Sequence, residues 1–359
     1  MKNNYVIIMA GGIGSRFWPF SRKAHPKQFQ DILGTGKTLL QQTAERFEGI
    51  CPPENMYIVT NDIYFDLVKE QLPFMEDDQI LLEPVMRNTA PCIAYASYKI
   101  AAKNPDANLV VTPADHIITK EEEFKRVVNS ALNEASQHDI LVTLGIQPSR
   151  PDTGYGYIQV KNSEQLGPLN KVKTFTEKPN EELAKEFVES GDFVWNAGIF
   201  IWKASSIIKA FETYSSEIGK LFSDISDKYY TPEEKEAIKL TYFQCKNISI
   251  DYGIMEKAQH VYVMRGDFGW SDLGTWKSLF EISEHDEKNN LVQANTLLYE
   301  TSNTLIKVSD PDKLVVIQGL DDYIVAEKDN VLLICKKDQE QRIKQFVSDC
   351  KEQKGKSFH

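Results

Sequence analysis

Apolar runs and amphipathic stretches alternate along residues 5–144. Short continuous apolar runs are typical of strands that are buried on both faces, and they occur at 5–10, 56–60, 79–83, 109–112 and 140–144. Between these runs the apolar residues recur at helical spacing, most regularly over 124–135. Thr38, Thr89 and Thr119 are expected to cap the helices that follow them. Strands that alternate with helices favour an α/β fold with a doubly wound, mostly parallel sheet.

The pattern changes twice in the rest of the chain. Strands are expected at 157–160, 172–176 and 198–202, with a helix from about Glu181 and a largely helical stretch over 204–239. Four short apolar runs separated by polar turns then follow, at 304–308, 314–317, 323–326 and 331–335. Regular short strands of this kind indicate a small all-β module, and the amphipathic pattern after residue 343 predicts a terminal helix. We therefore predict two domains, 1–287 and 288–359.

Composition and charge narrow the classes of protein. The net charge of −11 argues against a general nucleic-acid or anionic-membrane binder. The start of the chain does not resemble a signal peptide, and no apolar run approaches the length of a membrane helix. The five cysteines are widely spread and have no zinc-binding spacing. These features predict a cytoplasmic protein with no nucleic-acid or membrane partner.

A glycine-rich stretch follows the first expected strand. It contains three glycines, Gly11, Gly12 and Gly14. Glycines at a strand end allow positive φ angles and bring backbone N–H groups close to an anion. Residues 1–30 contain five Lys and Arg residues and no Asp or Glu. A basic segment in an acidic chain, with Arg16 and Lys27 beside the glycines and Arg22 and Lys23 between them, predicts a site for a polyphosphate.

Three further polar clusters lie just after expected strands. These are Arg87–Asn88, Asp115–His116 and Gly154–Tyr157. Ligands of open α/β sheets bind at the carboxyl ends of the strands. We therefore predict one pocket shared by these clusters and the glycine-rich stretch.

Two familiar nucleotide motifs are incomplete. Residues 34–38 resemble the end of a Walker A motif, but Asp31 stands where that motif needs glycine. Phe17 stands where a dinucleotide-binding fingerprint needs its third glycine. Both departures disfavour a P-loop ATPase and a nicotinamide-dependent dehydrogenase.

A series of short motifs runs between about residues 5 and 280. They are, in order along the chain, Gly11-Gly-x-Gly-x-Arg16, Glu83-Pro-x-x-Arg87-Asn-Thr-Ala-Pro91, Pro113-Ala-Asp115-His116, Gly154-Tyr-Gly-Tyr157-Ile, Glu177-Lys178-Pro179, Trp195-Asn196-Ala-Gly198, Ser249-Ile-Asp251-Tyr and Phe268-Gly-Trp-Ser-Asp272-Leu-Gly274. This series resembles, in the same order, the motifs of the bacterial mannose-1-phosphate guanylyltransferases, a group of sugar nucleotidyltransferases. Each motif alone is weak evidence, whereas the whole series in order is specific.

The resemblance implies a Rossmann-like catalytic domain that joins GTP and α-D-mannose 1-phosphate to give GDP-mannose and pyrophosphate. In such a reaction the sugar phosphate attacks the α-phosphorus in line, with help from Mg²⁺. This chemistry needs charge neutralisation and positioning more than a strong base. The resemblance therefore also implies a set of catalytic residues, namely Arg16, Lys27, Asp115, Lys178 and Asp272.

The resemblance assigns these residues to two substrates. For the nucleotide, Gly11, Gly12 and Gly14 would hold the phosphates with Arg16 and Lys27, Asp115 and Asp272 would bind Mg²⁺, and Arg87, Asn88 and Thr89 would read the purine. For the sugar phosphate, Lys178 would clamp the phosphate, Glu177 and Asn196 would bind the sugar hydroxyls, and Gly154 and Tyr155 would form a wall.

The residues alone leave simpler interpretations open. Arg16 and Lys27 could be solvated surface charges, Asp115 a helix cap and Asp272 a turn residue. Asn88 could merely start a helix. The enzyme could also use a heptose- or fucose-type sugar 1-phosphate, or the chain could be a non-catalytic regulatory paralogue. A silent paralogue would be expected to lack members of the catalytic set, and all of them are present.

The C-terminal region bears on the form of the enzyme. Longer relatives add a phosphomannose isomerase domain, and the tail of this chain has no His and Glu cluster that could bind its metal. Short relatives end in a small left-handed β-helix that helps them to dimerise. The resemblance thus implies a monofunctional homodimer whose β module is β-helix-like.

Overall fold

The structure is a computed structural model that describes residues 2–358, and the chain forms two compact units. The first unit comprises the chain up to Gly11, Thr43–Ala114 and Ile118–Trp270. The second unit comprises Gly12–Gln42, Asp115–Ile117 and the chain from Ser271 onward. The units are defined by packing, so most of the glycine-rich stretch groups with the C-terminal region. The predicted domain boundary after residue 287 stays a prediction.

A nine-stranded sheet forms the centre of the first unit, in the order β3-β2-β1-β4-β9-β6-β10-β8-β7. Its strands are β1 (Asn4–Met9), β2 (Met56–Asn61), β3 (Ile80–Glu83), β4 (Asn108–Pro113), β6 (Leu141–Ile146), β7 (Gly156–Leu166), β8 (Leu169–Glu177), β9 (Phe193–Lys203) and β10 (Val261–Arg265). Strand β9 runs antiparallel to its neighbours β4 and β6, and β8 runs antiparallel to its neighbours β10 and β7. The other seven strands therefore share one direction, which confirms the α/β fold with a mostly parallel sheet.

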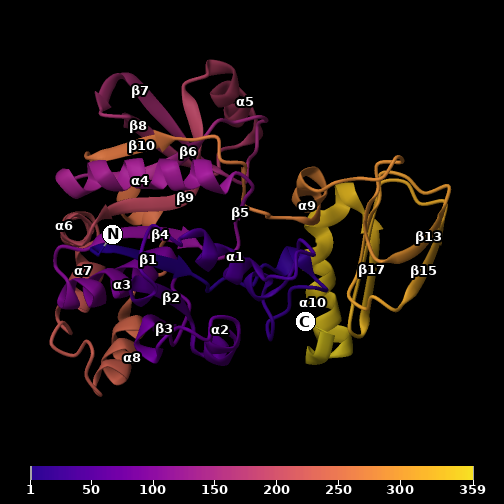
Figure 1. The fold of residues 1–359 in the computed structure, drawn as a ribbon, viewed down its shortest axis with the longest axis horizontal. Helices are drawn as coiled ribbons and strands as arrows, with labels where there is room; N and C mark the ends of the chain where they lie inside the picture. The colour runs from indigo at the N-terminus through magenta and orange to yellow at the C-terminus, as the bar shows by residue number, and fades with distance from the viewer. Residues whose placement is uncertain (1, 359) are drawn as a thin grey trace. The chain divides into compact units, whose positions relative to one another are not determined.

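Helices cover both faces of this sheet (Figure 1). They are α1 (Leu39–Arg46), which begins in the second unit, α2 (Phe65–Gln71), α3 (Thr89–Lys103), α4 (Glu121–Gln137), α5 (Glu181–Ser190), α6 (Ala204–Tyr214), α7 (Ser216–Ser223) and α8 (Glu234–Gln244). The apolar residues of α4 are all buried, as their spacing predicts, and α4 packs on β4 and β9. On the other face α3, α6 and α7 pack together over a core that includes Ile7 and Val111.

One of the three predicted helix caps is confirmed and two are wrong. Thr38 forms a capping box with Gln41, as expected. The other two threonines do not cap their helices. Asn88 is the N-cap of α3, and its side chain accepts from the Thr89 N–H. Thr119 instead pairs with Gly269, because α4 begins two residues further on.

The second unit contains a strand module in which successive turns of the chain stack. Its strands are β12 (Leu291–Gln293), β13 (Asn295–Tyr299), β14 (Leu305–Val308), β15 (Leu314–Gln318), β16 (Tyr323–Lys328) and β17 (Val331–Lys336). Parallel pairing joins β12 to β14, β14 to β16, and β13 to β15, which gives a β-helix-like coil. The last four strands confirm the prediction. Sequence reasoning missed β12 and β13, because β12 is only three residues long and β13 has its larger apolar residues on an exposed face.

The remaining elements are short or flank this module. They are α9 (Trp276–Ile282), the predicted terminal helix α10 (Ile343–Lys354), the paired strands β5 (Ile117–Ile118) and β11 (Trp270–Ser271), the single-turn elements η1 (Ser15–Phe17), η2 (Lys27–Phe29), η3 (Pro53–Asn55), η4 (Asp62–Tyr64), η5 (Asp77–Gln79), η7 (Lys337–Arg342) and η8 (Lys356–Phe358), and a π-helical turn, η6 (Asp251–Met255). None of the helices within residues 2–358 is both long and apolar enough to cross a membrane.

One aromatic cluster forms the core of the second unit. The Trp276 side chain is completely buried, with the Phe17 ring centroid at 4.9 Å and the Phe20 centroid at 5.7 Å. The same cluster includes Leu305 of β14 and Ile343 of α10. The residues just after the glycine-rich stretch therefore share a core with the strand module.

Arg22 adds polar contacts to this core. Its side chain is 12% exposed, and it donates to the carbonyl oxygens of Pro19 (3.1 Å) and Lys328 (2.9 Å) and to the Asn330 side chain (3.1 Å). The Arg22 guanidinium is nearly buried and links the segment around residue 20 to residues 328 and 330, so its role is to stabilise the unit.

We expect Arg22→Ala to destabilise the second unit by about 2 kcal/mol, because buried carbonyl groups lose a charged donor. Urea unfolding followed by tryptophan fluorescence measures the change, since Trp18 and Trp276 lie in this core. The control is Lys23→Ala at the neighbouring exposed position, which should change stability by less than about 0.5 kcal/mol. Equal effects of the two variants would contradict this role of Arg22.

Candidate active site

The glycine-rich loop of the second unit lies directly against Lys27. Gly14 has φ of 67°, and a Cβ atom added there would lie 2.6 Å from the Lys27 Cβ. The Lys27 backbone N–H donates to the Ile13 carbonyl at 3.3 Å. Only glycine combines this backbone conformation with so close an approach. The loop therefore needs Gly14 in order to pack over Lys27.

Lys27 is a buried charge. It is 3% exposed, and its Nζ lies 3.0 Å from Asp115 Oδ2. The same Nζ donates to the carbonyl oxygens of Leu273 (2.7 Å) and Asp272 (3.1 Å). An ammonium group has three N–H donors, and these contacts use all of them. The interpretation of Lys27 as a solvated surface charge is therefore wrong.

This ammonium group keeps Asp115 ionised. Burial alone would raise the pKa of Asp115, but the charge of Lys27, together with that of His116, outweighs burial and lowers the pKa below its ordinary value. The Asp115 side chain remains 31% exposed. A carboxylate is thus held in its charged form at a position that a ligand can reach.

Asp272 and Arg16 complete the polar lining. An oxygen of the Asp272 side chain accepts from the Gly274 N–H at 3.0 Å, as in a turn, so the turn interpretation holds locally. Arg16 donates to the Gly274 carbonyl at 3.3 Å. Its charge also opposes the rise that burial causes in the pKa of Glu340. The turn at residues 272–274 is therefore contacted by both Lys27 and Arg16.

These side chains surround a pocket of about 300 Å³ in the second unit. The lining residues are Gly14, Ser15, Arg16, Lys27, Asp115, His116, Asp272, Gly274 and Lys344. Sequence reasoning missed Lys344, which α10 contributes, because nothing in its local sequence ties it to residues near the N-terminus. The pocket combines several cations with two carboxylates, which suits a polyphosphate and a metal ion.

The donor set can be tested against Mg²⁺. Within residues 2–358 there is no group of three or more His, Cys, Asp and Glu side chains suited to a metal ion. Mg²⁺ commonly takes one or two carboxylates and completes its shell with phosphate oxygens and water. Asp115 and Asp272 therefore fit a Mg²⁺ that binds together with a polyphosphate.

A second polar cluster lies in the first unit, where β7, β8 and β9 meet. Gly156 pairs with Glu177, and a Cβ at Gly156 would lie 2.3 Å from Glu177 Oε2 and 3.4 Å from the Asn196 Cβ. The Glu177 side chain is 11% exposed and pairs with Lys178 Nζ, whose side chain is 61% exposed. The structure thus brings Glu177, Lys178 and Asn196 together around Gly156, which has no side chain to separate them.

An aromatic wall adjoins this cluster. The Tyr155 ring packs edge-on against Trp195 at 4.9 Å and Trp270 at 5.3 Å, measured between ring centroids. The Lys178 N–H donates to the Tyr155 carbonyl at 3.2 Å. Gly154 is exposed in the loop before Tyr155. The residues predicted to bind the sugar phosphate are therefore near one another within this unit.

The predicted purine-reading residues lie at the start of α3. Asn88 has φ of 67° and caps the helix. Thr89 accepts from the Ile250 N–H at 2.9 Å, and Arg87 donates to the Tyr242 carbonyl at 3.3 Å. The structure thus shows Asn88 in the simpler of its two expected roles, as a helix start. A contact with the base stays a prediction.

Comparison with known proteins places these sites in a family. A family model described as "Nucleotidyl transferase" matches residues 5–289. The chain belongs to the nucleotidyl transferase family. A second model, described as "MannoseP isomerase/GMP-like beta-helix domain", matches residues 294–349, in agreement with the coiled strand module. The family membership confirms the motif resemblance.

Individual proteins that are similar over most of this chain support the same family. "Alginate biosynthesis protein AlgA" of Pseudomonas aeruginosa is 36% identical over 96% of this chain and 71% of that protein. "Mannose-1-phosphate guanylyltransferase" of Escherichia coli K12 is 35% identical over 97% of this chain and 73% of that protein. A crystal structure described as a mannose-1-phosphate geranyltransferase from Thermus thermophilus has a TM-score of 0.86 at 30% identity, covering 96% of this chain and 98% of the other. Nucleotidyl transferases generally use a divalent metal.

Glu83 is a buried carboxylate of this nucleotidyl transferase that the site prediction missed, although it begins one of the quoted motifs. It ends β3 at 4% exposure, and a Cβ at Gly11 would lie 3.3 Å from its Oε2. Its Oε1 has no hydrogen-bond partner among the described residues. Burial raises the pKa of Glu83 to about 7, against a smaller opposing effect of the Tyr242 hydroxyl. A buried acid next to Gly11 therefore changes charge near neutral pH.

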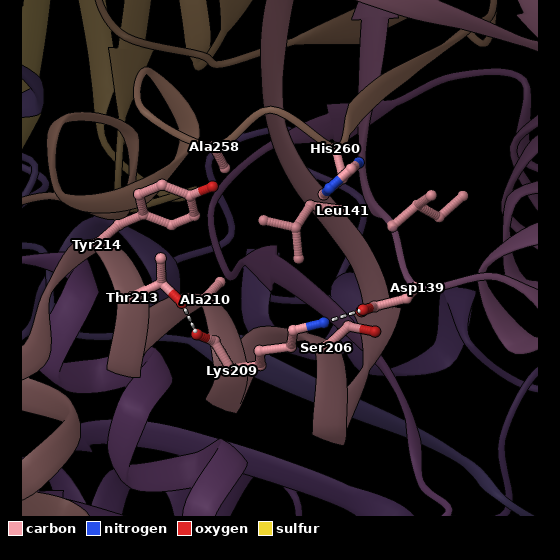
Figure 2. Close-up of a pocket in the computed structure, with 10 residues that line it drawn as sticks. Asp139, Leu141, Ser206, Lys209, Ala210, Thr213, Tyr214, Ala258 and His260 are labelled. Atoms are coloured by element: carbon pink, nitrogen blue, oxygen red, sulfur yellow. Dashed lines mark hydrogen bonds and ion pairs between the residues drawn. The ribbon is translucent and has the colours of Figure 1, made fainter.

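Another pocket, of about 170 Å³, lies elsewhere in the first unit (Figure 2). Asp139, Leu141 and His260 line it where β6 and β10 begin, and Lys209 Nζ pairs with Asp139 at 2.7 Å. Ligands of open α/β sheets bind at the opposite, carboxyl ends of the strands. None of the predicted site residues lines this pocket, and we assign it no part in the reaction.

Glu83 should make stability depend on pH. Its folded-state pKa lies above the ordinary value, so the folded protein loses stability as pH rises from about 4.5 to 7, by at most about 3 kcal/mol from this group. Glu83→Gln should remove this loss, so that the variant gains stability over the wild type as pH rises. Urea unfolding at several pH values measures the difference. The exposed Glu70→Gln serves as the control, and a difference that does not change with pH would contradict the prediction.

Proposed function

We propose that this chain transfers the GMP group of GTP to α-D-mannose 1-phosphate, giving GDP-mannose and pyrophosphate. The observation that carries the proposal is the ion pair between buried Lys27 and partly exposed Asp115 beside Gly14, which supplies a fixed cation and a charged carboxylate to one pocket of about 300 Å³. The relatives named mannose-1-phosphate guanylyltransferase support the choice of substrates.

The reaction exchanges one phosphate bond for another. An oxygen of the sugar phosphate forms a bond to the α-phosphorus of GTP, the bond from that phosphorus to the bridging oxygen breaks, and pyrophosphate leaves with the electron pair. Gly11, Gly12 and Gly14 would hold the phosphates with backbone N–H groups. Arg16, and Lys344 beside it in the pocket, would neutralise the departing pyrophosphate.

Lys27 and the two aspartates would act at the α-phosphorus. Lys27 would exchange one of its carbonyl partners for an α-phosphate oxygen, where negative charge increases in the transition state. Asp115 and Asp272 would hold Mg²⁺, which neutralises phosphate charge when it is bound.

The first unit would supply recognition of the sugar phosphate and the base. Lys178 is exposed enough to bind the sugar phosphate, and Glu177 and Asn196 would bind sugar hydroxyls beside the Tyr155 wall and Gly154. Arg87, Asn88 and Thr89 would contact the guanine from the start of α3. We place the enzyme in the cytoplasm, because its five cysteines are all free, as is typical of a reducing compartment.

Turnover assays test this function directly. With GTP, mannose 1-phosphate and Mg²⁺, we expect pyrophosphate release and GDP-mannose, identified by mass spectrometry. Lys27→Met and Asp272→Asn should each lower kcat/KM by about 10²-fold or more, because each removes charge stabilisation of the transition state. The control is Asp267→Asn, whose side chain is 87% exposed and forms an ion pair with Lys120 on the surface of the first unit.

Each part of the proposal can fail separately. A heptose or fucose 1-phosphate that clearly outperforms mannose 1-phosphate would make the sugar assignment wrong. Undiminished turnover of Asp272→Asn would make the metal assignment wrong. No turnover with any sugar 1-phosphate would favour a regulatory paralogue.

We also propose a homodimer formed through the strand module. β13 and β15 lie on the side of the module away from α10 (Figure 1). Leu297, Tyr299, Leu314 and Val316 point outward from these two strands and are 48–59% exposed. Leu297 pairs with Val316 in the ladder, so the four side chains form one apolar face. A contiguous apolar face of this kind marks a protein interface, and the face of a second copy matches it in chemistry.

Val316→Lys should dissociate the dimer, because a two-fold interface would contain the added charge twice in an apolar surface. Size-exclusion chromatography with light scattering should give the mass of two chains for the wild type and of one chain for the variant at low protein concentration. The control is Leu240→Lys, at an equally exposed leucine on α8 (56%), which should stay dimeric. A monomeric wild type, or a dimer that survives Val316→Lys, would contradict this interface.

A further inference from the structure

Asp251 lies in an unusual backbone segment beside the predicted sugar residues. It begins the π-helical turn η6, a conformation that is rare and is often found at functional sites. The residues before it are tied to the start of α3: Ile248 N–H donates to the Arg87 carbonyl (3.3 Å), and Ile250 N–H donates to Thr89 Oγ1 (2.9 Å). The segment that leads into Asp251 is therefore held by the residues on either side of Asn88, the N-cap of α3.

The Asp251 side chain holds the Asn196 amide. Asn196 Nδ2 donates to Asp251 Oδ1 at 3.0 Å. Asn196 Oδ1 accepts from Thr143 Oγ1 at 2.8 Å and from the Gly198 N–H at 3.2 Å. The backbone N–H of Gly198 can only donate, so it fixes which end of the amide is the oxygen.

This arrangement limits what Asn196 can offer to a ligand. The amide oxygen already accepts two hydrogen bonds, and one of the two N–H groups is used by Asp251. One N–H donor is left for a ligand. A group that binds to Asn196 must therefore supply an acceptor oxygen.

Glu177 supplies the opposite chemistry nearby. A Cβ atom built on Gly156 would lie 2.3 Å from Glu177 Oε2 and 3.4 Å from the Asn196 Cβ, so the carboxylate and Asn196 are both close to this glycine. An ionised carboxylate only accepts hydrogen bonds. A hydroxyl group can accept from Asn196 and donate to Glu177 at the same time, whereas a hydrogen or an ether oxygen cannot. The pair is thus built to select a hydroxyl.

The surroundings of Asp251 disfavour its negative charge. Burial, followed by the charge of Glu177, raises the pKa of Asp251 to about 6, while its own backbone N–H, Lys178 and Asn196 oppose the rise. The group is therefore mostly ionised at neutral pH, close to another carboxylate. A side chain that served packing alone would gain nothing from this charge.

We propose that Asp251 is a positioning residue that orients the Asn196 amide so that its remaining N–H donates to one sugar hydroxyl, which in turn donates to Glu177. The inference rests on the proposed function and adds Asp251 to its residues. It also explains specificity: the Asn196 N–H and the Glu177 carboxylate together recognise one hydroxyl of the sugar.

Two variants test the role of Asp251. Asp251→Ala removes the acceptor and should raise the KM for mannose 1-phosphate about tenfold or more, while the KM for GTP stays unchanged. Asp251→Asn keeps a neutral acceptor oxygen and should restore most of the loss. The control is Glu256→Gln at the end of the same turn, an exposed carboxylate that should leave both KM values unchanged. The melting temperature of Asp251→Asn should not fall below that of the wild type, because the variant removes a disfavoured charge.

Deoxy sugars separate positioning from general damage. The wild type and Asp251→Ala are compared on the 2-, 3-, 4- and 6-deoxy forms of mannose 1-phosphate. For the one analogue that lacks the hydroxyl read by Asn196, the tenfold effect of Asp251→Ala should disappear, and it should persist for the others. The same effect with every analogue, or an equal change in the KM for GTP, would overturn the inference. A wild type that makes no GDP-mannose would instead overturn the proposed function, and the inference with it.

Discussion

The buried ammonium group of Lys27 is the interaction on which the second unit's pocket depends. A charge at 3% exposure is tolerable only where every N–H finds an acceptor. Asp115 and the carbonyls of residues 272 and 273 supply these acceptors from two distant parts of the chain. Lys27 therefore contacts Asp115, the turn that carries Asp272, and the glycine-rich loop at the same time.

In the first unit, the partly buried carboxylate of Asp251 has a neutral amide as its side-chain partner, whereas Asp115 has an ammonium group. Asn196, Thr143 and Gly198 form a chain of hydrogen bonds that ends at Asp251. A missing side chain at Gly156 leaves room for Glu177 to approach Asn196. In our proposal, one N–H donor of Asn196 and one carboxylate acceptor of Glu177 face the same ligand hydroxyl, which is more selective than a single exposed charge. In the function that we propose, the two units thus differ in chemistry, with charge neutralisation in one and hydroxyl recognition in the other.

Much of this was available from the sequence, and the limits have physical reasons. The buried strands, the face of α4 and the last four strands of the module follow from local periodicity. The placement of Lys344, the burial of Lys27 and the network around Asp251 depend on contacts between segments that are far apart in the chain. Periodicity carries no information on such contacts. The prediction places the cap of α3 at Thr89 and the structure places it at Asn88, because both residue types can cap a helix and only the backbone conformation distinguishes them.

The shared core around Trp276 has a consequence for how this family can change. Phe17 and Phe20, just after the glycine-rich loop, pack on the same tryptophan as the strand module and α10. A β-helix borrowed from a distant relative would have to fit these aromatic rings as well as its own neighbours. The module is therefore not a freely exchangeable part, and the loop and the module are expected to be inherited together. The outer strands β13 and β15 belong to a separate apolar cluster, so their outward face can change without disturbing the core that the loop and the module share.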